Sequence, residues 1–164
     1  MNNDEIYRLI NGDNLDDNTN SNMLTVFVVK CDGNSFEVLS KCKEVLKIVL
    51  EHNENLELPL DEWRKLLPKW FVKKCSKERT KEEIDKYSKL PIEERKKITE
   101  GKGWVLSNWL YWFEPDQREW YWWSSKIVDN NTIKLVVAIE GWPFPWGALE
   151  WLCIACGAID IEEQ

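Results

Sequence analysis

Eleven of the 164 residues are tryptophan, and this number constrains the fold more than any other feature of the sequence. A Trp side chain buries roughly 150–250 Å² when it enters a core. At about 25 cal/mol/Å², burial of one indole stabilises the fold by on the order of 4–6 kcal/mol as an upper bound. A soluble monomer carries an apolar patch of roughly 300–600 Å², which leaves room for only two or three exposed indoles. We therefore expect most of the indoles to be core and a small subset to be free for function.

The length of the chain predicts one domain with one hydrophobic core. No stretch approaches the roughly 20 apolar residues that cross a bilayer, so we expect no membrane-spanning segment. The N-terminus lacks the basic start and apolar run of a secretory signal, and a chain of this size does not need its five Cys to form disulfides. These features predict a soluble protein of the bacterial cytoplasm.

Charge is distributed unevenly along the chain, whose formal net charge is −7. Residues 1–60 carry 5 basic and 11 acidic side chains, residues 61–103 carry 14 and 9, and residues 104–164 carry 3 and 9. The net negative charge argues against a nucleic-acid partner, because binding of phosphates needs a cationic face. The basic middle third is interpreted either as a solvated face of mixed charges or as an anion-binding patch.

The pattern of apolar residues predicts an α+β fold in which a small antiparallel sheet of about three strands is packed by several short helices. The polar run over 11–22 predicts a mobile loop, so we expect residues 1–23 to be a flexible N-terminal segment and residues 24–164 to form the domain. Strands are predicted by β-branched and aromatic runs over 24–29, 120–128 and 132–139. Helices are predicted by apolar spacing and caps over 35–50, 61–70 with a break at Pro68, 81–89, 91–100, 106–113 and 145–156. The predicted N-terminal caps are Asp61, Thr80 and Ser107.

The segment Gly141–Gly147 contains two prolines that alternate with aromatic residues. Each proline favours an extended conformation in the residue before it, which would point Trp142, Phe144 and Trp146 the same way. Such a strip could stack a planar ligand, a sugar ring or a side chain of a partner. The alternative is that the strip fastens the last helix to the sheet, with Pro145 at the first helical position.

The turn from Glu114 to Trp120 is the second candidate site. Arg118 could clamp a carboxylate or phosphate, or stack on an indole, and Glu114 and Asp116 could serve as polar anchors. The alternative is that Arg118 bridges acidic neighbours and covers an aromatic ring.

Motifs that carry catalysis are missing from the sequence, so no catalytic residue, metal site or cofactor is predicted. His52 is the one histidine and is placed at the end of a predicted helix. Cys153 and Cys156 form a Cys-x-x-Cys pair at the predicted C-terminal end of a helix, where the dipole does not favour a thiolate, so we interpret them as small buried residues. Phosphate loops and nucleophile elbows are also absent.

Several aromatic motifs in the C-terminal two-thirds resemble those of a group of small Trp-rich bacterial proteins of unknown function. The motifs are Pro68-x-Trp70-Phe71, Trp109-Leu110-Tyr111-Trp112, Arg118-x-Trp120-x-Trp122-Trp123 and Gly141-Trp142-Pro143-x-Pro145. The resemblance implies a single bacterial domain and no activity. A looser similarity of type, which rests on no motif, is to toxin immunity proteins, which act by covering a site on a partner.

Two functions remain open. The first is a non-enzymatic protein-binding module, of an immunity or regulatory kind, that uses the aromatic Pro-rich loop and the Arg118 turn; the acidic ends would favour a basic partner. The second is a small-molecule binding protein or enzyme that stacks a sugar or nucleotide on aromatic rings.

Overall fold

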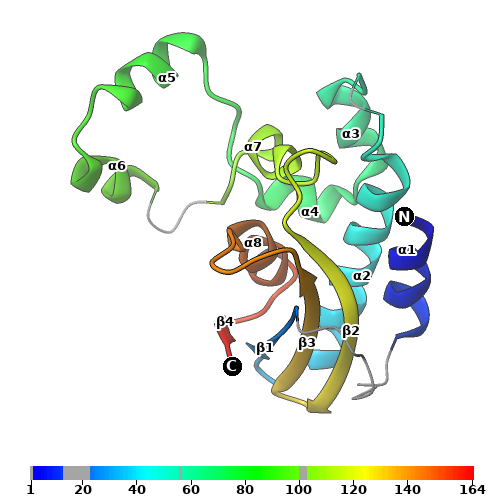
Figure 1. Cartoon of the computed structure of the whole chain (residues 1–164). Helices are drawn as coiled ribbons and strands as arrows, with labels where there is room; N and C mark the ends of the chain where they lie inside the picture. Colours follow the sequence, from blue (N-terminus) through cyan, green and yellow to red (C-terminus); the bar gives the residue numbers. More distant parts are fainter. Residues whose placement is uncertain (1, 13–22, 56, 100–102) are drawn as a thin grey trace.

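The computed structural model describes residues 2–12, 23–55, 57–99 and 103–164 (Figure 1). It confirms the α+β fold: four antiparallel strands form one sheet in the order β2-β3-β1-β4. The strands are β1 (Leu24–Lys30), β2 (Trp120–Asp129), β3 (Thr132–Ile139) and β4 (Asp160–Glu163). The helices are α1 (Asn2–Asn11), α2 (Ser35–His52), α3 (Leu60–Leu66), α4 (Lys69–Lys74), α5 (Lys81–Ser88), α6 (Ile92–Thr99), α7 (Leu106–Tyr111) and α8 (Gly147–Ala155). Within the described ranges, no helix is long and apolar enough to cross a membrane.

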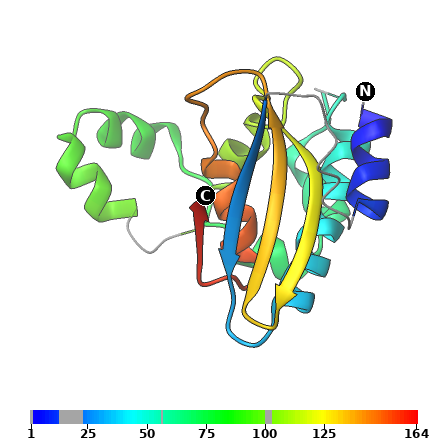
Figure 2. The same ribbon diagram turned by 60° about the horizontal axis from the view of Figure 1, so that its bottom comes forward.

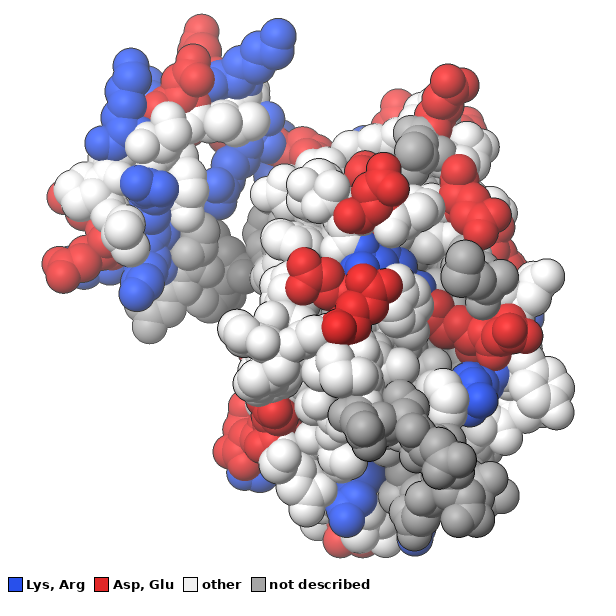
Figure 3. Space-filling model, in the orientation of Figure 1, with Lys and Arg blue, Asp and Glu red and all other residues white. Residues whose placement is uncertain are grey.

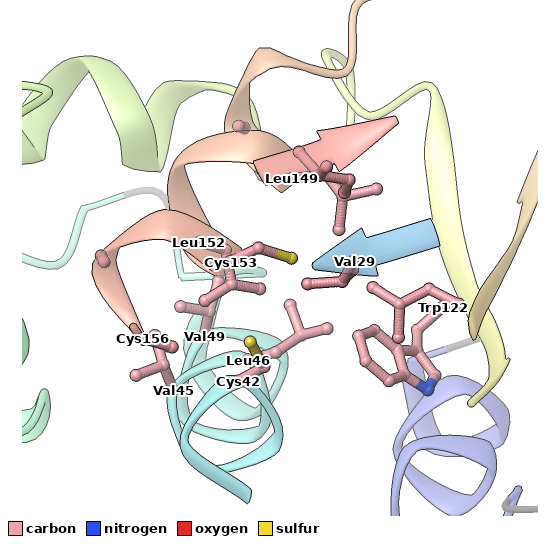
Figure 4. Packing of buried hydrophobic residues seen from close by; sticks show 14 of the residues in the cluster. Val29, Cys42, Val45, Leu46, Val49, Trp122, Leu149, Leu152, Cys153 and Cys156 are labelled. Carbon is pink, nitrogen blue, oxygen red and sulfur yellow. The ribbon is translucent and has the colours of Figure 1, made fainter. Parts of the chain in front are cut away.

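The core lies between the sheet and the helices gathered behind it in Figure 2. Alternate residues of β3 point into this core, as the period of two predicts: Ile133, Leu135, Val137 and Ile139 are all buried. Helix α2 supplies the facing layer, and α8 closes it beside β4. The packing is drawn in Figure 4, where Val29 of β1, Trp122 of β2, Leu46 of α2 and Leu149 of α8 meet.

Helix α1 corrects the prediction of a flexible segment over residues 1–23. Asn2–Asn11 is helical, Leu9 is fully buried, and Glu5 is 5% exposed. The helix packs on β2 and α2, so it belongs to the domain. Its apolar face is short, and its key contact is ionic, which is why apolar spacing does not reveal it. Residues 13–22 of the predicted polar loop lie outside the described residues.

Most other elements agree with the sequence pattern, and the differences are local. The Thr80 hydroxyl accepts a hydrogen bond from the Glu83 backbone N–H, as predicted for the cap of α5. Asp61 and Ser107 are not caps, because α3 begins after Pro59 and α7 after Val105. Strand β4 was not predicted; four residues, most of them acidic, form an edge strand only because β1 offers them backbone partners.

Helices α5 and α6 form an arm that projects from the body (Figure 1); we use "the arm" for residues 77–99. Its root is closed by backbone pairing, since the Ser76 N–H donates to the Trp104 carbonyl oxygen at 2.9 Å. Gly103 lies at this root, where an added Cβ would come within 2.2 Å of the Lys74 carbonyl oxygen. Only glycine allows the two chain segments to approach this closely.

Candidate functional site

The indoles are distributed as the sequence arithmetic predicts. Buried indoles are Trp63, Trp109, Trp120 and Trp122, and partly buried indoles that pack on the core are Trp70, Trp104, Trp112, Trp146 and Trp151. Trp123 is half-buried under Arg8, whose guanidinium lies 3.4 Å from the ring centroid. Trp142 is the most exposed, at 57%. The functional question therefore concerns Trp142 and the half-buried rings.

The Pro-rich loop is mainly a fastening for α8. The ring of Phe144 is buried and meets Phe27 of β1 edge-on at 6.2 Å, and Trp146 packs on the same Phe27 ring at 4.9 Å. Trp146 is also the residue that precedes α8. Of the predicted strip, only Trp142 remains open to a partner, so a continuous aromatic strip is not presented. Pro145 precedes α8 and is not its first residue.

Arg118 is buried and cannot clamp a ligand, which corrects the prediction for this residue. Its guanidinium forms two parallel hydrogen bonds to the Glu5 carboxylate, at 2.5 and 2.7 Å, and a third to the Trp120 carbonyl oxygen at 2.8 Å. The Glu5 carboxylate also accepts a hydrogen bond from the backbone N–H of Trp122 at 2.8 Å. The alternative prediction fits the structure better, because Arg118 pairs with a carboxylate and covers aromatic rings. The carboxylate, however, comes from α1 and not from the turn.

Glu114 and Asp116 stay at the surface beside this buried pair. Glu114 is half-buried, and Asp116 is exposed. In the face shown in Figure 3, Asp and Glu predominate on the body. These carboxylates do not converge on a base or a metal-ligating side chain, and among the described residues no group of three or more His, Cys, Asp or Glu is arranged to hold a metal ion.

A groove of about 560 Å³ between the arm and α7 brings together aromatic rings that the sequence places in separate motifs. Its volume lies in the range of roughly 300–1,000 Å³ that is typical of ligand sites. The groove is lined by Arg79, Tyr87, Trp104, Asn108, Tyr111 and Trp112, together with Gly103 and Val105. We call this "the aromatic groove".

Each wall of the aromatic groove contains a contact between neighbouring side chains. Arg79 lies over the Tyr87 ring at 4.5 Å, and Tyr111 meets Trp112 edge-on at 5.4 Å. Tyr111 is 44% exposed, whereas Trp104 and Trp112 are half-buried. The groove therefore offers several ring surfaces, one amide and one guanidinium to a ligand.

A signal for this groove is present in the sequence although our predictions did not use it. In the helix after residue 105, the apolar stripe runs through Leu106, Trp109, Leu110 and Phe113. Tyr111 and Trp112 lie off that stripe, and large rings off the core-facing stripe are candidates for a surface site. What the pattern cannot show is that the arm folds back to supply Tyr87 and Arg79.

The cysteines are packing residues, as predicted for Cys153 and Cys156. Both are buried, and no disulfide joins them. Hydrogen bonds with these two thiols, together with burial, raise the pKa of Cys42 in α2 well above its ordinary value. Since the thiolate is the reactive form, the raised pKa makes the Cys42 thiol unreactive near pH 7.

Cys75 is the most accessible thiol, and burial raises its pKa to about 11. We expect iodoacetamide to alkylate Cys75 slowly at pH 7 and roughly tenfold faster with each pH unit, because only the thiolate reacts. Mass spectrometry of the native chain checks this, with Cys42 and Cys153 unlabelled throughout. Alkylation of Cys75 at pH 7 as fast as in the urea-unfolded chain would contradict the raised pKa.

Comparisons of this chain with protein-family models, with curated proteins and with solved structures found no match. The resemblance to small Trp-rich bacterial proteins therefore stays an expectation.

Proposed function

We propose that this chain is a non-enzymatic protein-binding module that holds an extended segment of a partner protein in the aromatic groove. The observation that carries the proposal is the convergence of Tyr87, Trp104, Tyr111 and Trp112 on one concave surface. Grooves lined by aromatic rings recur in proteins that bind extended peptides, because rings give large contact area at low entropic cost. An immunity or regulatory role would use such a surface to cover a partner.

The arm supports this proposal by its exposed apolar side chains. Ile84 is 51% exposed, Ile92 65% and Ile98 41%, and no described residue of α5 is buried. Helices of eight residues are marginal in water unless they are packed, and contiguous exposed apolar surface marks contact sites. A partner that lies in the groove would also cover part of the arm and stabilise its helices.

The proposal is tested by selecting binders from a display library of random 12-residue peptides against the folded chain. We expect enriched peptides whose binding is lost in Tyr111→Ala and Trp112→Ala. The matched control is Trp142→Ala, which removes an exposed ring outside the groove and should leave binding within about twofold of wild type. Circular dichroism confirms that each variant is folded.

Two outcomes would contradict the proposal. One is a selection that enriches no peptide against the folded chain. The other is a set of peptides whose binding is lost in Trp142→Ala and kept in the two groove variants, since this would return the site to the Pro-rich loop.

A second candidate function is small-molecule binding, which the size of the groove and its ring surfaces favour. A sugar or nucleotide could stack on Trp104 or Trp112, with Arg79 and Asn108 as polar anchors. A thermal-shift screen supports this function if one compound class raises the melting temperature and Arg79→Ala removes the rise. If peptides bind and no such compound does, the protein-binding function is preferred.

A further inference from the structure

We infer that the segment bound in the aromatic groove is acidic: it places an Asp or Glu carboxylate on the Arg79 guanidinium and an apolar ring against the indoles. The inference rests on the proposed function and adds the chemistry of the partner. Three observations on the walls of the groove carry it.

The first observation is the charge of the groove lining. Arg79 is the one charged residue among the side chains that line the groove in the described part of the chain. The wall on the body side, residues 103–113, contains no Asp, Glu, Lys or Arg at all. A carboxylate that enters the groove therefore meets a cation and no lining anion.

The second observation is the charge of the chain that leads into the groove. Residues 69–81 contain six Lys or Arg and one acidic residue, Glu78. Lys73, Lys74, Lys77 and Lys81 are exposed, and the Lys74 backbone abuts Gly103 at the root of the arm. On the face drawn in Figure 3, the arm carries Lys and Arg side chains interspersed with Asp and Glu. The excess of positive charge in residues 69–81 steers an acidic segment toward the groove.

The third observation is the way Glu78 is held. Its carboxylate accepts hydrogen bonds from the Ser107 N–H at 3.0 Å and the Ser107 hydroxyl at 2.7 Å. Glu78 is thus tied to the start of α7, while Arg79 next to it faces the groove. A guanidinium that lies on an aromatic face keeps its edge free to bind a carboxylate through two parallel hydrogen bonds.

A peptide fits these observations better than a nucleic acid. The whole chain carries a net charge of −7, which opposes the approach of a polyphosphate backbone, whereas a short acidic segment needs only the local positive field. A basic partner, which the acidic ends of the chain favour, would bind other surfaces of the body and not the groove. The arm side of the groove, with Arg79 and Tyr87, belongs to the basic third of the chain.

The test uses the peptides enriched by display, synthesised and measured by fluorescence anisotropy at 150 mM salt. We expect an excess of Asp and Glu in these peptides and a loss of affinity of about tenfold in Arg79→Glu, the size of a lost charge-assisted contact. Arg64→Glu is the matched control, because it makes the same charge change on α3 beside Asp61. It should alter the affinity by less than about twofold, because Arg64 does not line the groove.

Arg79→Glu could loosen the arm, because Arg79 lies over Tyr87. A charge-swapped peptide resolves this: with its Asp and Glu changed to Lys, it should bind Arg79→Glu better than wild type, which an unfolded arm cannot do. Three outcomes would overturn the inference and leave the groove as a binding site. They are enriched peptides without acidic residues, equal effects of the two Arg variants on affinity, and displacement of the peptide by a single-stranded oligonucleotide. A selection without any enriched peptide would overturn the proposed function as well.

Discussion

Replacing Arg118 with Met is expected to lower the free energy of unfolding by about 3–5 kcal/mol, the range measured when one partner of a buried ion pair is removed. The substitution leaves the Glu5 carboxylate buried with only the Trp122 N–H as a hydrogen-bond donor among the contacts described for it. It also frees the Trp120 carbonyl oxygen. Both losses fall on the contact between α1 and β2.

Urea denaturation followed by far-UV circular dichroism measures this loss, and hydrogen exchange locates it. We expect the amides of α1 to exchange faster than those of α2, because the ion pair is the main polar tie of α1 to the sheet. The double variant Glu5→Gln with Arg118→Met should lose less free energy of unfolding than the sum of the losses in the two single variants. The reason is that no unpaired charge is then buried.

Additive costs in this double-mutant cycle would show that Glu5 and Arg118 do not act as a pair. Glu162→Gln is the comparison on the surface, because it removes the partner of Lys30 in an exposed ion pair. Exposed pairs contribute little, so this change should be nearly silent.

The second large effect is expected at Phe144, where the change to Ala should cost about 3 kcal/mol. The ring is 6% exposed and packs on Phe27, so its loss leaves a cavity between β1 and the loop before α8. Trp142→Ala, two residues earlier in the same loop, removes a ring that is 57% exposed. It should change stability by only about 0.5 kcal/mol.

Chemical denaturation of the two variants side by side tests whether the Pro-rich loop fastens α8 or presents a surface. Equal costs for Phe144→Ala and Trp142→Ala would contradict the division of the loop into one buried and one exposed ring. A larger loss of stability in Trp142→Ala than in Phe144→Ala would show that Trp142, and not Phe144, fastens the loop.

The elements that could be predicted are those that are determined by residues close together in the sequence. The period of two in Thr132–Ile139 and the break at Pro68 are set by neighbouring residues, and both appear in the structure. Strand β4 could not be predicted, because its acidic residues are held by pairing with β1, which lies 130 residues away in the sequence.

The candidate site was predicted less well, for the same physical reason. Arg118 and Glu5 are 113 residues apart, so the sequence shows an unpaired cation in a charged turn where the fold makes a buried pair. Trp142, Phe144 and Trp146 are adjacent in sequence, but one β1 ring, Phe27, decides which of them are covered. The aromatic groove is composed of separate segments that meet only when the root of the arm closes at Ser76.

The most direct test of the groove is a nuclear magnetic resonance titration of the indole N–H signals. The eleven indoles give separate reporters across the molecule, and single Trp→Phe variants assign them. With a peptide selected against the folded chain, we predict that the signals of Trp104 and Trp112 shift while those of Trp109 and Trp142 stay in place. A titration that shifts Trp142 and leaves Trp104 and Trp112 unchanged would contradict the assignment of binding to the aromatic groove.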